Sequence, residues 1–322
     1  MRVLVLSNMR PDFRRPERGR FVRDQVNALR RLPDLDVELH EFPPGGPALL
    51  AAARALRRSR PREPFDVVHA HFGLTAYPAL AVPARLRGLT LHGTDLRHPR
   101  TRLATRAILD LLDLLAVPSA ELLRELPGGA ARRRALLLPC GVDLERFRPL
   151  DRAHARAELG LHPERPCLLF PADPARPGKR HDRALALARL DTGAGSSPDE
   201  VTLLTLGGVE PERVPLLVNA ANAVLVPSEH EGFGLAVLEA LACDVPVLAT
   251  PVGVHPEALH DLPGTLCAPF DLDLWRAALQ PHLRDHDPRI QGRARAEPYS
   301  AQRTAERLAG AWSALLHPGR VA

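Results

Sequence analysis

Two carboxylates on either side of a glycine-containing turn are the strongest chemical signal in this sequence. Glu231 stands directly before residues 232–235, which contain two glycines, and Glu239 follows eight residues after Glu231. A glycine has no Cβ, so a ligand can approach the backbone closely there. A carboxylate further along can accept two hydrogen bonds from a ribose diol, as the acidic residue of dinucleotide folds does. Residues of these types suit binding of a nucleotide sugar, with one carboxylate near each end.

The neighbouring residues predict the elements that position this turn. Residues 223–227 and 245–249 are short, apolar, β-prone runs, and residues 235–242 between them are apolar and helix-forming. In a strand, loop, helix, strand unit, the helix N-terminus lies at the carboxyl edge of the sheet and favours a phosphate. Eight helical residues rise about 12 Å, which matches the span from the ribose to the far sugar of an extended nucleotide diphosphate sugar.

The wider segment carries a family resemblance. Two glutamates at this spacing are by themselves most often solvated charges. Residues 231–235, followed by residues 239–243 and 246–250, together resemble the donor-site signature of the family 4 retaining glycosyltransferases. This resemblance implies transfer of a sugar from a nucleotide diphosphate sugar, with a UDP or GDP sugar as the donor, to an acceptor hydroxyl of a glycan, a lipid or a small molecule.

Two motifs in the first half extend the resemblance. Gly19 lies within residues 16–24, and His92 lies within residues 89–95, whose sequence is Leu-Thr-Leu-His-Gly-Thr-Asp. Alone, Gly19 is a turn residue and His92 is more often a structural histidine. The resemblance implies that the backbone at Gly19 lies against the distal phosphate of the donor, and that His92 acts at the sugar ring and on the acceptor side.

The diphosphate of such a donor needs cations. Lys179 matches the family lysine and is the only lysine among 43 Lys and Arg residues, which suggests that a compact ammonium is required there. The family arginine falls five or six residues earlier, where this sequence has Asp173 and Pro174. Arg176 is the nearest substitute, and Arg180 is the alternative.

The predicted site follows from these matches. The predicted catalytic residues are His92, Glu231 and Lys179. The predicted donor-binding residues are Gly19, Arg176, Lys179, Glu231, Gly232, Phe233, Gly234, Leu235 and Glu239. Besides the displaced arginine, two further positions depart from the family pattern: Cys140 replaces a usual Asn, and Val254 replaces the second of two usual glycines.

Neither a metal nor a cofactor is predicted. His69 and His71 share one face of a strand at a spacing that could bind metal, but no third ligand is evident nearby, so we interpret them as packing residues. Asp271 and Asp273 resemble a metal-binding pair, and a helix cap is the favoured interpretation.

Alternation of strand and helix patterns predicts the architecture. We expect two doubly wound, Rossmann-like α/β domains that face each other across a cleft, the GT-B fold, at residues 1–148 and 149–298, with a helix at 299–322 that returns to the first domain. Strands are expected at residues 3–7, 37–42, 66–71, 89–92, 114–117 and 135–139, and then at 167–171, 201–206, 223–226, 246–249 and 265–267. Helices of the first block are expected at residues 19–31, 48–58, 76–86, 101–112 and 120–126.

Composition narrows the function classes. Hydrophobic residues make up 45% and charged residues 25% of 322 residues, as in soluble globular proteins. The net charge of +5 comes without a nucleic-acid motif, so no nucleic-acid partner is expected. The arginine groups at residues 10–23 and 54–62 would suit peripheral contact with an anionic membrane, although a solvated face is the commoner role. We expect a cytoplasmic protein whose four scattered cysteines are reduced and buried.

Two alternatives to sugar transfer stay open. The same fold would serve an epimerase or a sugar phosphorylase. A non-catalytic relative that only binds a nucleotide sugar or a partner is the other alternative, because the family arginine is displaced.

Overall fold

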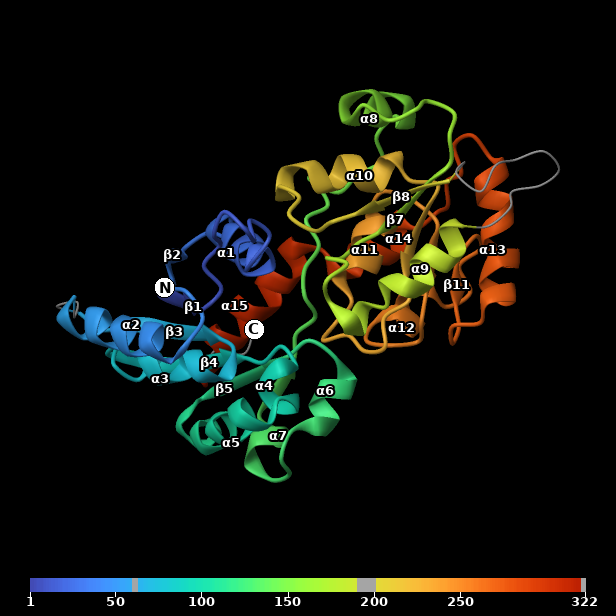
Figure 1. Cartoon of the computed structure of the whole chain (residues 1–322). Coiled ribbons are helices and arrows are strands. Elements are labelled where there is room, and N and C mark those ends of the chain that lie inside the picture. The colour runs from blue at the N-terminus through green and yellow to red at the C-terminus, as the bar shows by residue number, and fades with distance from the viewer. Residues whose placement is uncertain (60–62, 190–200, 320–322) are drawn as a thin grey trace. The chain divides into compact units, whose positions relative to one another are not determined.

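Two compact units, each built on its own parallel β-sheet, make up the chain in a computed structural model that describes residues 1–59, 63–189 and 201–319 (Figure 1). Unit 1 consists of residues 1–141 and 301–322, and unit 2 consists of residues 142–300. The sequence predicts domain boundaries at 148/149 and 298/299, a few residues from these divisions. The expected α/β class with two Rossmann-like sheets is confirmed.

The sheet of unit 1 has the order β2-β1-β3-β4-β5-β6 in the described residues, and every neighbouring pair is parallel. Parallel strands need crossover connections, and alternating strands and helices supply them. The strands are β1 (Arg2–Ser7), β2 (Asp36–Glu41), β3 (Phe65–His71), β4 (Ala84–Thr90), β5 (Leu114–Val117) and β6 (Ala135–Leu137).

Helices cover both faces of this sheet, because alternate strand residues point in opposite directions. Val3 and Val5 pack in one core with Trp312 of the last helix, whereas Leu4 and Leu6 pack in a second core. The α-helices of unit 1 are α1 (Arg20–Arg30), α2 (Gly46–Arg58), α3 (Ala76–Ala79), α4 (Thr94–Arg97), α5 (Pro99–Ile108), α6 (Ala120–Glu125), α7 (Ala130–Arg133) and α15 (Ala301–Leu316). The 3-10 helices are η1 (Gly73–Thr75) and η2 (Leu109–Leu111).

One predicted helix of unit 1 is wrong over most of its length. We expected a helix at residues 76–86 and a strand at 89–92, but the helix ends at Ala79 and β4 already begins at Ala84. Ala and Leu favour a helix locally. Pro83 cannot continue one, and pairing with β3, which aligns Phe65 with Ala84, decides the outcome.

The sheet of unit 2 has the order β11-β10-β9-β7-β8, again parallel throughout the described residues. The expected strands are confirmed as β7 (Cys167–Phe170), β8 (Thr202–Thr205), β9 (Ala223–Val226), β10 (Val247–Ala249) and β11 (Leu266–Cys267). The α-helices are α8 (Arg152–Leu159), α9 (His181–Ala188), α10 (Val214–Ala220), α11 (Leu235–Ala242), α12 (His255–Leu259), α13 (Leu272–Arg284) and α14 (Arg293–Ala296). The 3-10 helices are η3 (Pro177–Lys179), η4 (Pro211–Arg213) and η5 (Glu297–Tyr299).

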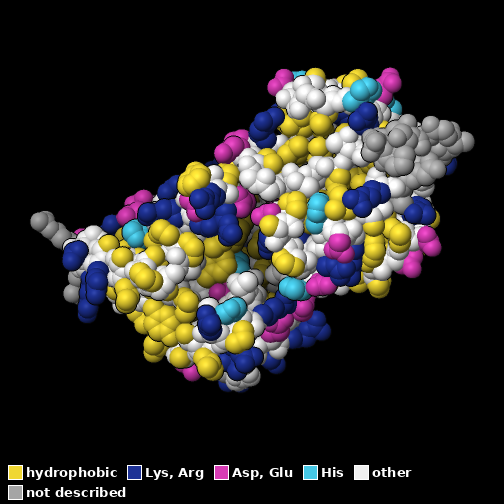
Figure 2. All heavy atoms as spheres, viewed as in Figure 1, with side chains coloured by type: hydrophobic (Ala, Val, Ile, Leu, Met, Phe, Trp, Pro, Cys, Tyr) yellow, Lys and Arg dark blue, Asp and Glu magenta, His cyan; other side chains and the backbone are white. Residues whose placement is uncertain are grey.

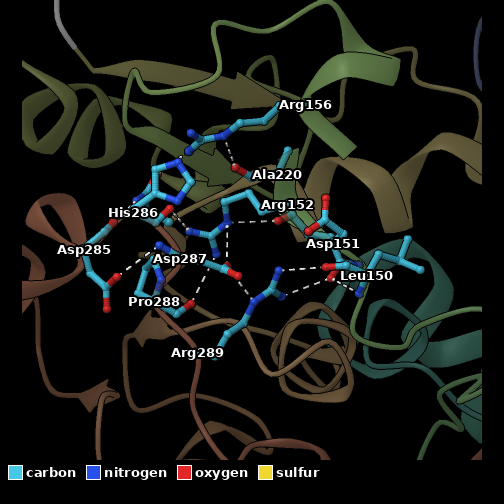
Figure 3. Close-up of polar contacts among 12 residues, drawn as sticks. Leu150, Asp151, Arg152, Arg156, Ala220, Asp285, His286, Asp287, Pro288 and Arg289 are labelled. Carbon is cyan, nitrogen blue, oxygen red and sulfur yellow. Dashed lines mark hydrogen bonds and ion pairs between the residues drawn. The ribbon is translucent and has the colours of Figure 1, made fainter. Parts of the chain in front are cut away.

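Buried arginines hold the connecting segments of unit 2 in place (Figure 3). Arg152 is 1% exposed and donates to the carbonyls of Asn219 and Pro288, while its guanidinium lies 3.2 Å from a carboxylate oxygen of Asp287. Arg289 donates to the Leu150 carbonyl at 2.9 Å. Burial lowers the pKa of Arg152 to about 10, so it stays charged at neutral pH. These cations therefore satisfy loop carbonyls that would otherwise be buried without donors.

Candidate functional site

The turn after β9 has a backbone that only glycine accommodates easily. Gly234 is the N-cap of α11 and has a φ of 100°. A Cβ at this position would lie 2.4 Å from Nε2 of His255. Gly253 has a φ of 61°, and a Cβ there would lie 2.3 Å from the Phe233 carbonyl oxygen. Two glycines thus let the segments 232–235 and 252–255 pack against each other at the start of α11.

This packing presents the positive end of α11. The helix has no acidic residue in its first turn, so no side chain of that turn neutralises the partial positive charge of the helix N-terminus. Val254 donates from its backbone N–H to the Phe233 carbonyl at 2.8 Å, and its side chain is 4% exposed. Val254 therefore fits where the family usually has glycine.

Lys179 and Glu231 form a close ion pair beside this turn. Nζ of Lys179 lies 2.5 Å and 2.7 Å from the two carboxylate oxygens of Glu231, and the side chains are 17% and 10% exposed. Burial alone would raise the pKa of Glu231, but the charge of Lys179 and hydrogen bonds from Lys179 and Ser228 lower it overall. Glu231 is therefore ionised at neutral pH.

The loop that carries Lys179 also carries both candidate arginines. Arg180 donates to the carboxylates of Asp182 and Glu229 at distances of 2.7 to 2.8 Å. Arg176 is exposed, and no ion pair of Arg176 occurs within the described residues. Arg180 is thus already engaged, and Arg176 is the available cation.

Glu239 lies within α11. The helix begins at Leu235, and the segment just before it contains Gly232, Phe233 and Gly234. Its side chain is partly buried. The structure thus brings Lys179 and Glu231 into contact at the beginning of α11 and places Glu239 on the same helix. Arg176 belongs to the loop before α9.

Unit 1 carries the other two predicted residues. Gly19 is the N-cap of α1 with a φ of 69°, and a Cβ there would lie 2.4 Å from the Met9 carbonyl oxygen. His92 follows β4 and is partly exposed. Its ring packs against the rings of Phe21 and Phe72, with ring centroids 4.9 Å and 4.6 Å away.

Asp95, which was not predicted as a site residue, fixes the loop that carries His92. Asp95 accepts hydrogen bonds from the backbone N–H of His92 at 2.6 Å and of Gly73 at 2.8 Å. Asp95 is 4% exposed, and burial raises its pKa although these hydrogen bonds oppose the shift. The Asp three residues after His92 was the available signal, because an Asp that follows at this spacing can accept from a backbone N–H.

The other residues considered as ligands have structural contacts. His69 and His71 are 0% and 1% exposed and pack inside unit 1. Asp271 caps α13 by accepting from the Leu274 N–H at 2.8 Å, as predicted. In the described part of the chain, no group of three or more His, Cys, Asp or Glu residues is arranged to hold a metal ion.

The arginine-rich loop near the start of unit 1 pairs much of its charge internally. Arg18 lies 2.8 Å from Asp12, Arg20 lies 2.8 Å from Asp24, and both ion pairs are within unit 1. On the face drawn in Figure 2, basic and acidic side chains are interspersed over the surface. None of the described helices is both long and apolar enough to cross a membrane.

The prediction that all four cysteines are buried is partly wrong. Cys167 and Cys243 are buried, but Cys140 and Cys267 are only partly buried; all four are free thiols.

Comparisons with known proteins agree with the motifs. The family described as "Glycosyltransferase Family 4" matches residues 1–146, and "Glycosyl transferases group 1" matches residues 199–301. D-inositol 3-phosphate glycosyltransferase of Mycobacterium avium is 35% identical over 76% of this chain and 68% of the relative. The enzyme of that name from Actinosynnema mirum is 32% identical over 86% of this chain and 79% of the relative. The chain belongs to the family 4 glycosyltransferases. The Mycobacterium marinum relative is 33% identical over 73% of this chain, which spans only 59% of that relative's length.

Solved structures place this family 4 member in the GT-B fold. Sucrose-phosphate synthase from Thermosynechococcus elongatus superposes with a TM-score of 0.76 at 20% identity, over 99% of this chain and 100% of that chain. Anabaena HepE in complex with UDP-glucose superposes with a TM-score of 0.70 at 17% identity, over 98% and 100% of the two chains. Identities this low establish the fold alone.

Proposed function

We propose that this protein is a retaining glycosyltransferase that moves a sugar from a nucleotide diphosphate sugar to an acceptor hydroxyl. The observation that carries the proposal is the contact between Lys179 and Glu231 in the segments next to the N-terminus of α11, which brings together a cation, a carboxylate and the positive end of a helix. A diphosphate needs the cation and the N–H groups, and sugar hydroxyls need the carboxylate. Glu239 on α11 is the proposed ligand of the ribose diol.

The proposed chemistry balances without a metal ion. The bond between the anomeric carbon and the diphosphate oxygen breaks through an oxocarbenium-like transition state, and the acceptor oxygen bonds to the anomeric carbon from the same face. The acceptor proton passes to the departing phosphate oxygen. Lys179, Arg176 and the α11 N-terminus stabilise the charge that develops on the diphosphate. The configuration at the anomeric carbon is therefore retained.

Unit 1 supplies the second part of the proposal. We assign the backbone at Gly19 to the distal phosphate of the donor, and His92 to the sugar ring and the acceptor side. The D-inositol 3-phosphate glycosyltransferases that resemble this chain support a phosphorylated cyclitol as the first acceptor to try. Anabaena HepE with UDP-glucose supports UDP sugars as the first donors.

Two measurements test this function. Thermal-shift assays against UDP, GDP and ADP and their sugars identify the donor base, because only the cognate nucleotide raises the unfolding temperature strongly. NMR of the product then gives its anomeric configuration. An inverted product would overturn the retaining mechanism, and tight nucleotide binding without transfer to any acceptor, unaltered by Glu231→Ala, would favour a non-catalytic binding protein.

A further inference from the structure

Three histidine rings pack in series inside unit 1, and only the last of them belongs to the site described above. His69 and His71 lie on β3, and His92 follows β4. The ring centroids of His69 and His71 are 5.4 Å apart, and those of His71 and His92 are 5.3 Å apart with an interplanar angle of 17°. Neither His69 nor His71 reaches solvent. Because both rings are buried, any part they play in the reaction would be indirect.

The two hydrogen bonds of His69 determine which of its nitrogens carries the proton. Trp312 Nε1–H can only donate, and it lies 3.3 Å from Nδ1 of His69. Nδ1 is therefore the acceptor, and the proton of neutral His69 is on Nε2, which donates to Oγ1 of Thr90 at 2.8 Å. Gly88 makes this placement feasible, because a Cβ at residue 88 would lie 2.3 Å from Nδ1 of His69.

One hydrogen bond joins the rings of His71 and His92. Nδ1 of His71 lies 3.1 Å from Nε2 of His92, so one nitrogen donates and the other accepts. Nε2 of His71 is buried and has no hydrogen-bond partner among the described residues. If His71 accepted, its own proton would be on Nε2, as a buried N–H without an acceptor. Buried N–H groups without acceptors are rarer than acceptors without donors, so the favoured arrangement has His71 donating from Nδ1–H.

The surroundings of His92 hold its ring in one orientation. Phe21 and Phe72 pack against it, and Asp95 ties its backbone N–H to the turn that follows β3. Phe72 has a φ of 71°, which is rare for a bulky residue. A strained residue in direct contact with His92 is typical of a site where the fold over-determines the position of a functional group.

We propose that His71 is a positioning residue for sugar transfer: by donating from Nδ1–H to Nε2 of His92, it fixes the His92 proton on Nδ1. His92 then presents a hydrogen-bond donor, and not a base, to a substrate oxygen. A donor suits the proposed reaction, in which the departing phosphate takes the acceptor proton. This inference rests on the proposed function, but the protonation pattern it specifies can be measured without any substrate.

The decisive experiment is NMR of the full chain with ¹⁵N-labelled histidine. His92→Asn identifies the His92 signals, and we expect them to show the Nδ1–H tautomer, although free histidine in water favours Nε2–H. His71→Leu should shift His92 toward the Nε2–H tautomer. His71→Asn should keep Nδ1–H, since the Asn amide N–H lies close to where the imidazole Nδ1–H was. Nε2–H in the wild type, or an unchanged His92 tautomer in His71→Leu, would overturn the inference.

Kinetics separate this role from a structural one. We expect His71→Leu to lower kcat about tenfold with little change in KM for the donor, and His71→Asn to restore most of it. His98→Asn is the matched control, because His98 is exposed and lies outside the cluster. Circular dichroism and thermal unfolding of the full chain report whether each variant is folded. Equal kcat losses in the Leu and Asn variants would contradict the positioning role, whereas absence of transfer by the wild type would refute the proposed function and leave the NMR result standing.

Discussion

Nζ of Lys179 lies within 2.7 Å of both carboxylate oxygens of Glu231, so each residue holds the other where we expect a donor to bind. The two loops that carry them are also joined by the backbone, since the Glu229 N–H donates to the Gly178 carbonyl at 2.9 Å. A donor diphosphate that binds Lys179 would either accept a hydrogen bond alongside Glu231 or replace Glu231 as the partner of the ammonium. The pair therefore holds the ammonium in place before a ligand arrives.

The first prediction concerns the cations that bind the diphosphate. Lys179→Ala should reduce UDP affinity by about 10- to 100-fold, because it removes a charge-assisted interaction worth about 1.5–3 kcal/mol. Arg176→Ala should weaken binding by about tenfold, and Arg180→Ala should have little effect, since Arg180 is already paired with Asp182 and Glu229. Isothermal titration calorimetry at constant ionic strength provides the comparison. A larger loss for Arg180→Ala than for Arg176→Ala would reverse the assignment.

The second prediction uses the lowered pKa of Glu231. A carboxylate whose pKa is lower in the folded protein than its ordinary 4.5 stabilises the fold above that value, and the contribution is lost as the pH falls through the folded pKa. Glu231→Gln should therefore lower the free energy of unfolding at pH 7 by about 1–3 kcal/mol. The difference from the wild type should shrink below about pH 4.

The matched control is Glu229→Gln, because the Glu229 ion pair with Arg180 is half exposed on its carboxylate side. Its loss should cost less than about 1 kcal/mol at pH 7. Urea unfolding of both variants at pH 7 and pH 3.5 makes the test. A Glu231→Gln deficit that stayed constant down to pH 3.5 would show that the ion pair is not its source.

Local patterns predicted most of the fold but not its non-local contacts. The strands β1, β3, β5 and β9 were recognisable because short apolar runs next to helical segments typify a parallel sheet. β4 was misjudged because its sequence, Ala-Arg-Leu-Arg-Gly-Leu-Thr, resembles a helix until it is paired with β3. Propensity is a weak signal that tertiary pairing overrides.

In the candidate site, too, the sequence predicted local features but not contacts between distant residues. Glu231 and the glycines around it were recognisable because they are adjacent in sequence. The ion pair of Lys179 with Glu231 joins loops 52 residues apart, and the contact of His71 with His92 spans 21 residues. Neither contact has a local signature. Within the described residues, the Nε2 atoms of His71 and His255 are buried without a hydrogen-bond partner, and this burial arises only once the chain has folded.

The third prediction tests the turn before α11. Gly234→Ala should lower the free energy of unfolding by about 2–4 kcal/mol and reduce UDP affinity, because the methyl group would collide with the buried His255 ring at a φ of 100°. Gly310→Ala is the control. Residue 310 lies inside α15 with nothing within 4 Å of its added Cβ, so that change should stabilise by up to about 1 kcal/mol. Normal UDP affinity in Gly234→Ala would show that the turn does not contact the donor.

The fourth prediction concerns the other end of α11. Arg293 donates to the Ala242 carbonyl at the end of this helix and to the carbonyls of Phe147 and Leu144, each at 2.9 Å. A cation at a helix C-terminus is favourable, and the carbonyls are partly buried. Arg293→Met keeps the side-chain length but removes these donors, so we expect a loss of about 2–4 kcal/mol in the free energy of unfolding.

Hydrogen exchange distinguishes this effect from general destabilisation. The amides of α11 and of residues 144–150 should exchange faster in Arg293→Met than those of α13, because only the former lose a partner of Arg293. Arg295→Met on the same helix, α14, is the control, since Arg295 is exposed and its replacement should change stability by less than about 0.5 kcal/mol. Uniform acceleration across unit 2 would mean that Arg293 stabilises the whole unit and does not specifically hold the C-terminal end of α11.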